Sequence, residues 1–247
     1  MSLSIIILAA GQGTRMRSAR PKVLQHLAGR PLLRHVVECA RVLEAGDICV
    51  VYGHGGEQVQ GAFADDGLRW ALQAEQLGTG HAVRQAMPGT PDANRVLILF
   101  GDVPLLRPET LSQLLAECGA NDLGVLTVDV DNPHGYGRII RENGQVVRNV
   151  EEKDANDDER RINEINSGVM CAPAKRLKGW LDRLGNHNSQ GEYYPTDIIA
   201  IEREIEHHLQ SQWSVANYGE VAGFSASVGG PVRLNGSKDE RKNFAAD

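Results

Sequence analysis

The sequence contains no long hydrophobic run. None of its apolar stretches approaches the roughly 18 consecutive residues that a membrane-spanning helix requires. Met1-Ser2 leads directly into an apolar stretch, without the basic segment that opens a secretion signal. Hydrophobic residues make up 41% and charged residues 23% of the 247 positions, close to the average for globular proteins. We therefore expect a soluble, cytoplasmic protein with one large α/β domain or two small ones.

Excess positive charge and paired cysteines are also missing. The 26 basic residues are outnumbered by 32 acidic ones, for a net charge of −6, which argues against a nucleic-acid-binding surface. The four cysteines are scattered, without a Cys-x-x-Cys motif. We expect them to be reduced and buried rather than to form a zinc site or disulfides. They are Cys39, Cys49, Cys118 and Cys171.

The two best-known glycine motifs for nucleotides are absent from the N-terminal loop. No G-x-x-x-x-G-K-[ST] run follows Gly11, and Met16 stands where the dinucleotide motif has its third glycine. The loop instead follows a buried apolar strand, is built from small residues, and is followed by the cations Arg15 and Lys22. Small residues let backbone N–H groups approach anionic oxygens. The pattern indicates a nucleoside triphosphate site, although the Gly-x-Gly pair alone fits an ordinary strand-to-helix turn equally well.

The complete string resembles a known signature loop. Leu8-Ala9-Ala10-Gly11-x-Gly13-Thr14-Arg15-Met16, followed by Pro21-Lys22, is similar to the loop of sugar-1-phosphate nucleotidylyltransferases. It most resembles the uridylyltransferase domains of the bacterial enzymes that make UDP-N-acetylglucosamine. The resemblance implies catalytic roles for Arg15 and Lys22. It also implies nucleotide contacts from Leu8, Ala9, Ala10, Gly11 and Gly13.

Strand and helix patterns alternate through the first half of the chain. Residues 31–45 show apolar side chains at helical spacing, and residues 47–53 form a second apolar strand. This order predicts a right-handed parallel unit, in which ligands bind beyond the carboxyl ends of the strands. We expect the α/β class, with a Rossmann-like, mixed, mostly parallel sheet flanked by helices. The resemblance implies that this sheet is of the type found in nucleotide-diphospho-sugar transferases.

The segment after a short strand at residues 70–73 is polar and carries two carboxamides. Gln73 and Gln76 can each donate and accept hydrogen bonds, which suits recognition of a base edge, and Gly78-Thr79 would let a ring lie close to the backbone. The alternative is a plain loop with Thr79 as a helix N-cap. The resemblance favours uridine recognition by Gln73, Gln76, Gly78 and Thr79.

The clearest central strand, residues 95–102, ends in Phe100-Gly101-Asp102. A carboxylate at this edge is the hard oxygen ligand that Mg²⁺ prefers together with phosphates and water. The alternative is that Asp102 caps the turn before Pro104. The resemblance implies that Asp102 is catalytic and holds Mg²⁺, and that Phe100 and Gly101 contact the nucleotide. Phe100 replaces the Tyr usual in the family.

The second half of the chain predicts an antiparallel lid for a second substrate. Asn143-Gly144, flanked by apolar pairs, is a strong hairpin signal. A helix is expected after residue 173, and Thr196 or its neighbour is expected to cap a later one. Taken singly, the polar residues here read as turn or surface positions. The resemblance assigns the sugar to Gly137, Glu151, Asn166 and Thr196.

The resemblance covers residues 4 to about 200 and then fades. The nearest counterpart of the family's second metal ligand, an Asn, is Ser225, which we retain as a candidate Mg²⁺ ligand. Residues 228–247 show little apolar periodicity and are expected to be an atypical, disordered tail after a nucleotidylyltransferase domain at 1–227. The hexapeptide repeats of the family's acetyltransferase domain are not found. We therefore do not expect acetyl transfer, and we expect the protein to be a monomer.

The resemblance implies a UDP-N-acetylglucosamine diphosphorylase that supplies a cell-wall precursor. UTP and N-acetylglucosamine 1-phosphate would be joined with release of pyrophosphate and without a covalent intermediate, so positioning and charge neutralisation would carry the catalysis. Two alternatives remain open. One is a nucleotide-sugar-binding protein with impaired catalysis, suggested by Ser225. The other is a nucleotidylyltransferase for another sugar phosphate or for molybdopterin.

Overall fold

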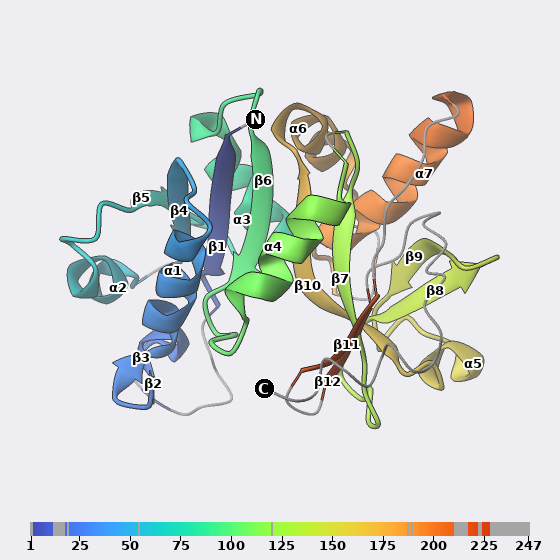
Figure 1. The fold of residues 1–247 in the computed structure, drawn as a ribbon, viewed down its shortest axis with the longest axis horizontal. Helices are drawn as coiled ribbons and strands as arrows, with labels where there is room; N and C mark the ends of the chain where they lie inside the picture. Colours follow the sequence, from blue (N-terminus) through green and yellow to red (C-terminus); the bar gives the residue numbers. More distant parts are fainter. Residues whose placement is uncertain are drawn as a thin grey trace.

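The computed structural model describes residues 2–11, 18, 20–53, 55–119, 121–186, 188, 190–209, 217–221 and 224–227, with side chains as far as residue 203. A sheet forms the centre of the molecule (Figure 1). Eight of its ten strands lie in the spatial order β11 (Asn217–Val221), β12 (Phe224–Ser227), β7 (Gly124–Asp129), β10 (Glu164–Pro173), β6 (Arg95–Phe100), β1 (Leu3–Ala9), β4 (Asp47–Tyr52) and β5 (Arg69–Leu72), and the other two, β8 (Arg138–Glu142) and β9 (Gln145–Val150), branch off at β10.

The sheet is mixed, as the sequence predicts. Strand β1 pairs in parallel with β4 and β6, and β4 pairs in parallel with β5. Strand β10 is antiparallel to both β6 and β7, so β7 runs in the same direction as β1. The carboxyl ends of these five parallel strands therefore point to the same edge of the sheet.

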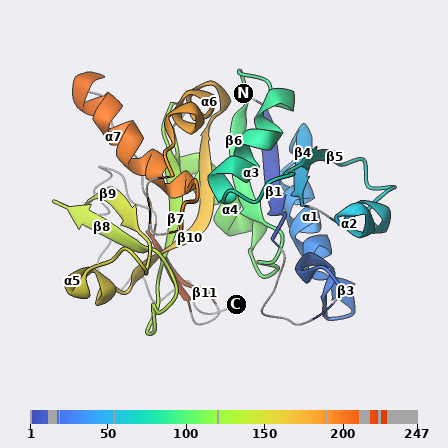
Figure 2. The same cartoon turned by 180° about the vertical axis from the view of Figure 1, so that it is seen from behind.

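Helices cover both faces of the sheet. Figure 1 shows α1 and α4 on one face, and Figure 2 shows α3, α6 and α7 on the other. The smaller helices α2 and α5 lie near opposite ends of the sheet. The helices are α1 (Leu32–Val42), α2 (Glu57–Ala62), α3 (Thr79–Ala86), α4 (Pro108–Glu117), α5 (Asp157–Arg160), α6 (Ala174–Arg183) and α7 (Ile198–Leu209). Three 3₁₀ turns and a short hairpin complete the described fold: η2 (Lys22–Leu24), η3 (Met87–Gly89), η4 (Pro195–Asp197), β2 (His26–Leu27) and β3 (Arg30–Pro31).

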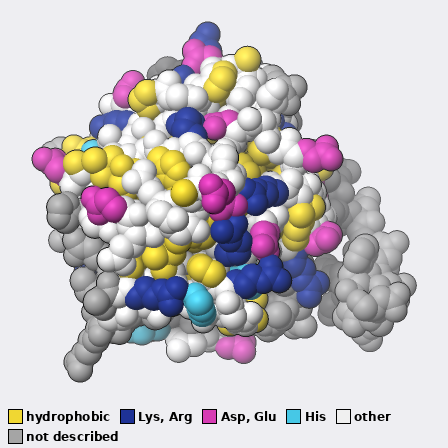
Figure 3. Space-filling view, turned by 90° about the vertical axis from the view of Figure 1, so that its left-hand side faces the viewer, with side chains coloured by type: hydrophobic (Ala, Val, Ile, Leu, Met, Phe, Trp, Pro, Cys, Tyr) yellow, Lys and Arg dark blue, Asp and Glu magenta, His cyan; other side chains and the backbone are white. Residues whose placement is uncertain are grey.

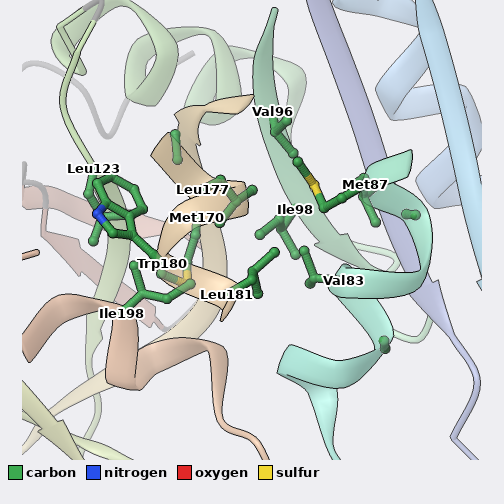
Figure 4. Close-up of a cluster of buried hydrophobic side chains, with 14 of the residues drawn as sticks. Val83, Met87, Val96, Ile98, Leu123, Met170, Leu177, Trp180, Leu181 and Ile198 are labelled. Carbon is green, nitrogen blue, oxygen red and sulfur yellow. The ribbon is translucent and has the colours of Figure 1, made fainter. Parts of the chain in front are cut away.

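Strand β1 is buried on both faces, which explains its unbroken apolar sequence. Ile5 and Ile7 pack in the cluster formed with α1 and α4, whereas Ile6 and Leu8 pack in the cluster formed with α3 and α6. Alternate side chains of a strand point to opposite faces, so one short strand contributes to two cores. Figure 4 shows the second cluster, where Trp180 of α6 lies among aliphatic side chains from the sheet and from α3 and α7.

The hairpin predicted at Asn143-Gly144 is confirmed. Strands β8 (Arg138–Glu142) and β9 (Gln145–Val150) pair antiparallel. Asn143 and Gly144 have φ angles of 52° and 81°, as a two-residue turn of this kind requires. Arg138 is buried and pairs with Glu152, with 2.6 Å between Nη2 and Oε2. This ion pair fixes the base of the hairpin against the segment that follows it.

Some predicted boundaries are wrong. Helix α1 ends at Val42 rather than at residue 45, because Glu44 takes a φ of 52° that ends the helical path. Gly78, not Thr79, is the N-cap of α3, and its φ of 98° is accessible mainly to glycine. Thr196 lies inside η4, which ends at Asp197 directly before α7, so the expectation that Thr196 or its neighbour caps that helix stays a prediction. The predicted tail at 228–247 lies outside the described residues.

The surface beside α1 carries mixed charge. Figure 3 shows basic and acidic side chains next to one another on this side of the molecule. Asp66 receives hydrogen bonds from both Arg34 and Arg41, at 2.6 and 2.9 Å, and Arg30 pairs with Glu38. No helix in the described part of the chain is long and apolar enough to cross a membrane. The four cysteines are free and buried, as expected.

Candidate functional site

A pocket of about 220 Å³ lies at the carboxyl edge of β1, β5 and β6. Most of the residues predicted to bind nucleotide line it, together with both described residues predicted to be catalytic. These are Leu8, Ala9, Ala10, Gly11, Lys22, Gln73, Gln76, Gly78, Thr79, Phe100 and Asp102. Sequence reasoning missed three further lining residues, Val23, Ala82 and Glu192. Gly13 and Arg15 lie outside the described residues.

Lys22 and Asp102 form an ion pair at this pocket. Nζ of Lys22 donates to Oδ2 of Asp102. Gly101, next to Asp102, is closely packed, because a Cβ there would lie 3.1 Å from Leu33 Cδ1, 3.3 Å from Val23 Cγ1 and 3.4 Å from the Cβ of Ala9. Gly101 itself contributes to the site through this close packing and through its N–H, which donates to Leu8 at 2.9 Å.

The amide nitrogens of the two glutamines predicted to recognise the base already donate hydrogen bonds within the protein. Gln76 Nε2 donates to the carbonyl oxygen of Ala10 at 2.8 Å. Gln73 is only 3% exposed, and its Nε2 donates to the carbonyl oxygen of Gly78 at 2.9 Å and lies 3.2 Å from His81 Nδ1. Gln73 therefore offers a ligand its acceptor oxygen rather than a donor, whereas Gln76 offers its acceptor oxygen and its second amide hydrogen.

Gly53 packs against Ala10 and Gln76, two residues that line the pocket. The sequence did not indicate this role. A Cβ at this position would lie 2.7 Å from the carbonyl oxygen of Ala10 and 3.1 Å from Nε2 of Gln76. The first distance is shorter than any ordinary contact, and the crowded atom is backbone. Glycine directly after β4 is therefore what allows Ala10 and Gln76 to meet.

Three of the four predicted sugar-binding residues, Gly137, Glu151 and Thr196, lie around the side chain of Asn149, and Asn166 joins them through the backbone of Gly137. Its Nδ2 donates to Glu151 Oε1 at 2.8 Å and to Thr196 Oγ1 at 3.1 Å. A Cβ on Gly137 would lie 2.6 Å from Asn149 Oδ1, and Gly137 accepts a backbone hydrogen bond from Asn166 at 3.0 Å. The sequence analysis missed Asn149, although its amide is what joins Glu151 to Thr196.

Asn166 and Gly168 connect this group to the nucleotide pocket. The Asn166 side chain accepts a hydrogen bond from the Gly168 N–H at 2.8 Å. Gly168 has a φ of 83°, and a Cβ on it would lie only 2.4 Å from the ring of Phe100. The turn that presents Asn166 therefore packs directly on the aromatic ring that lines the first pocket.

A second hollow, of about 420 Å³, borders Asn149 and Glu151. It is acidic: Asp154 and Asp197 also line it, beside Tyr194. Burial raises the pKa of Glu151, and the hydrogen bond from Asn149 opposes this. Burial, together with the neighbouring Glu151 and Asp154, raises the pKa of Asp197 to about 6. Uncharged hydroxyl donors, such as those of a sugar, suit such a group of acceptors.

Ser225 lies on β12, opposite Asp129 of β7. Its side chain is outside the described part of the chain, so its predicted metal contact stays a prediction. Among the described residues no cluster of three or more His, Cys, Asp or Glu side chains forms a metal site. Asp102 and Glu192 are thus the carboxylates that line the nucleotide pocket among the described residues.

The fold and the pocket define a nucleotidyltransferase. Residues 5–182 match the MobA-like NTP transferase domain, and the chain belongs to this family. It is 57% identical over 198 residues to the "Bifunctional protein GlmU" of Herminiimonas arsenicoxydans, which covers 80% of this chain and 44% of that protein. It is 56% identical over 207 residues to the protein of the same name from Azoarcus sp. (strain BH72), covering 83% and 46%. The chain spans less than half the length of these relatives.

Solved structures show the same fold. A UDP-glucose pyrophosphorylase crystallised with UDP-glucose superimposes with a TM-score of 0.65 at 17% identity, covering 83% of this chain and 88% of the other. The apo form of a UDP-glucose pyrophosphorylase gives 0.64 at 16% identity, with the same coverage. At this identity the likeness concerns the fold alone.

Proposed function

We propose that the chain is a uridylyltransferase that joins UTP and N-acetylglucosamine 1-phosphate to form UDP-N-acetylglucosamine and pyrophosphate. The observation that carries the proposal is the continuity of the two residue groups. The pocket of Lys22, Gln73 and Asp102 connects, through Phe100 and Gly168, to the polar group around Asn149. A nucleotide and a sugar joined by two phosphates span such an arrangement.

The proposed chemistry needs two polyanions to be brought together. An oxygen of the sugar phosphate attacks the α-phosphorus of UTP in line, and pyrophosphate leaves. Lys22 neutralises phosphate charge at the mouth of the pocket, and Arg15 is proposed to do the same from the loop. The glutamine carboxamides orient the base, and Glu151, Asn166 and Thr196 orient the sugar. Positioning of this kind supplies most of the rate enhancement in such transfers.

Mg²⁺ is proposed as the cofactor, with Asp102 as its protein ligand. The donor chemistry fits, because Mg²⁺ is commonly held by one or two carboxylates together with phosphates and water. When bound, Mg²⁺ neutralises charge on the phosphates. Asp102 must then exchange its present partner, Lys22, for the ion, and Lys22 becomes available to the phosphates.

The test is release of pyrophosphate from UTP and N-acetylglucosamine 1-phosphate, with Mg²⁺ present or omitted. Metal-dependent release, with UDP-N-acetylglucosamine identified by mass, supports the proposal. Replacing UTP by CTP, ATP or GTP should give much slower release. Binding of UDP-N-acetylglucosamine without turnover would favour the alternative of a nucleotide-sugar-binding protein, in which Ser225 does not replace the family's asparagine.

A further inference from the structure

The directions of the hydrogen bonds around Gln73 follow from one backbone atom, the carbonyl oxygen of Gly78. Nε2 of Gln73 contacts both the carbonyl oxygen of Gly78, at 2.9 Å, and Nδ1 of His81, at 3.2 Å. A carbonyl oxygen can only accept a hydrogen bond, so the atom facing it must be the amide nitrogen. That nitrogen has two hydrogens, and Gly78 and His81 take both. Gln73 has no donor left for a ligand.

The contact with Gln73 also fixes the tautomer of His81. Because Gln73 donates to Nδ1, this ring nitrogen must be unprotonated, and the proton of the neutral imidazole must lie on Nε2. Gln85 faces Nε2, with its amide nitrogen 3.0 Å away. Two N–H groups cannot bond each other, so Gln85 must turn its carbonyl oxygen towards Nε2 instead. That turn gives up only the longer 3.4 Å contact of Gln85 with the His81 carbonyl.

The remaining atom of the Gln73 amide is its carbonyl oxygen. Gln73 lines the nucleotide pocket. A few buried side-chain atoms of the described residues have no hydrogen-bond partner, and Oε1 of Gln73 is not one of them. An acceptor at this position matches a base that presents an N–H at its edge, as uracil does at N3. Cytosine presents an unprotonated nitrogen there, and two acceptors repel each other.

We propose that His81 is a positioning residue that fixes the orientation of the Gln73 amide and thereby sets the preference for uracil over cytosine. The inference rests on the proposed function, because it concerns the base of the same nucleotide. His81 does not line the pocket; it acts through Gln73. Gly78 assists, but its single carbonyl oxygen can hold only one of the two amide hydrogens.

The test compares binding of UDP and CDP to two variants by titration calorimetry. His81→Leu removes the acceptor while keeping a similar volume, and one amide hydrogen of Gln73 becomes free. UDP affinity should fall about tenfold, or about 1.4 kcal/mol, with CDP affinity unchanged or improved. His81→Asn keeps an acceptor near the position of Nδ1, and its UDP-to-CDP ratio should stay within about threefold of the wild type.

A matched substitution provides the control. His35 is another helical histidine, on α1, and its Nε2 lies 2.8 Å from the carbonyl oxygen of Leu27. His35→Leu should leave the UDP-to-CDP ratio unchanged. An unchanged ratio in His81→Leu overturns the inference, as does an equal loss for both nucleotides. If the wild type binds neither UDP nor CDP, the proposed function fails instead, so the two failures are distinguishable.

A measurement on the wild type keeps the inference testable if His81→Leu does not fold. The ring-nitrogen chemical shifts of ¹⁵N-labelled protein report the tautomer of each histidine, and comparison with His81→Asn identifies the His81 signals. Protonation at Nε2 is expected. Protonation at Nδ1 would contradict the donation from Gln73 and overturn the inference.

Discussion

Lys22 and Asp102, 80 residues apart in the chain, are ion-paired at the mouth of the nucleotide pocket. Their side chains are 41% and 26% exposed, so water reaches both. The pairing joins a cation expected to meet phosphate with a carboxylate expected to meet a metal ion. The proposed function therefore requires each side chain to exchange this partner for phosphate or for the metal ion.

Loss of Lys22 should affect metal and nucleotide binding in opposite directions. Lys22→Gln leaves Asp102 without its cation, so Mg²⁺ titrated into the nucleotide-free protein should bind more tightly. UDP affinity should fall about tenfold, because a charge-assisted hydrogen bond to phosphate is lost. Lys178→Gln is the matched control, since Lys178 is paired with Asp92 away from the pocket. Weaker Mg²⁺ binding in Lys22→Gln would contradict the competition.

Gly53 should tolerate no side chain. In Gly53→Ala the new Cβ would lie 2.7 Å from the Ala10 carbonyl oxygen, so the phosphate loop or Gln76 must shift. We expect UDP affinity to fall about tenfold and the protein to lose about 1–3 kcal/mol of stability. Gly61→Ala on α2 is the control, with no atom within 4 Å of its Cβ, and should be neutral or stabilising. Equal behaviour of the two variants in calorimetry and thermal melts would refute this account of Gly53.

Asn149 should matter for the sugar and not for the nucleotide. Asn149→Leu removes the hydrogen bonds to Glu151 and Thr196, and the pKa of Glu151 should rise further because that bond lowers it. The measurement is the affinity of UDP-N-acetylglucosamine relative to UDP, which should fall about tenfold. Gln145→Leu, an exposed position on the same strand, serves as control. A variant that weakens UDP equally would indicate general damage rather than loss of sugar contacts.

Asp197 should make folding stability depend on pH. Its pKa is raised from the ordinary value of 3.8 to about 6, so the folded chain binds the proton more tightly than the unfolded chain. Its contribution is fully present below about pH 4 and is lost as the pH rises through 6. Asp197→Asn should therefore match the wild type near pH 4 and exceed it at pH 7 by about 1 kcal/mol, allowing for solvent screening. Denaturant unfolding at both values checks this, and a pH-independent difference would rule it out.

Local patterns in the sequence predicted much of the architecture. The apolar run of β1 required burial on both faces, and Asn143-Gly144 required a hairpin; the structure confirms both. Boundaries failed where tertiary packing decides. Thr79 has the chemistry of a cap, but a Cβ on Gly78 would lie 2.8 Å from the Tyr193 carbonyl oxygen. Glycine at position 78, with its positive φ, therefore begins the helix.

The site was predictable residue by residue but not as a set of contacts. The glycine loop and the strand ends indicated Lys22 and Asp102, yet nothing local showed that they pair. Asn149 was missed because its partner Thr196 lies 47 positions away, and only the packing of β9 against η4 brings them together. The direction of the Gln73 amide likewise depends on its contacts with Gly78 and His81, which no local pattern in the sequence specifies.

The most direct test of the central claim is pyrophosphate release by the purified chain supplied with UTP, N-acetylglucosamine 1-phosphate and Mg²⁺. The account predicts release that needs all three components and falls about 10²- to 10³-fold in Lys22→Ala, as for other preorganised charge-stabilising groups. Absence of release, together with no calorimetric binding of UDP-N-acetylglucosamine, would contradict the account.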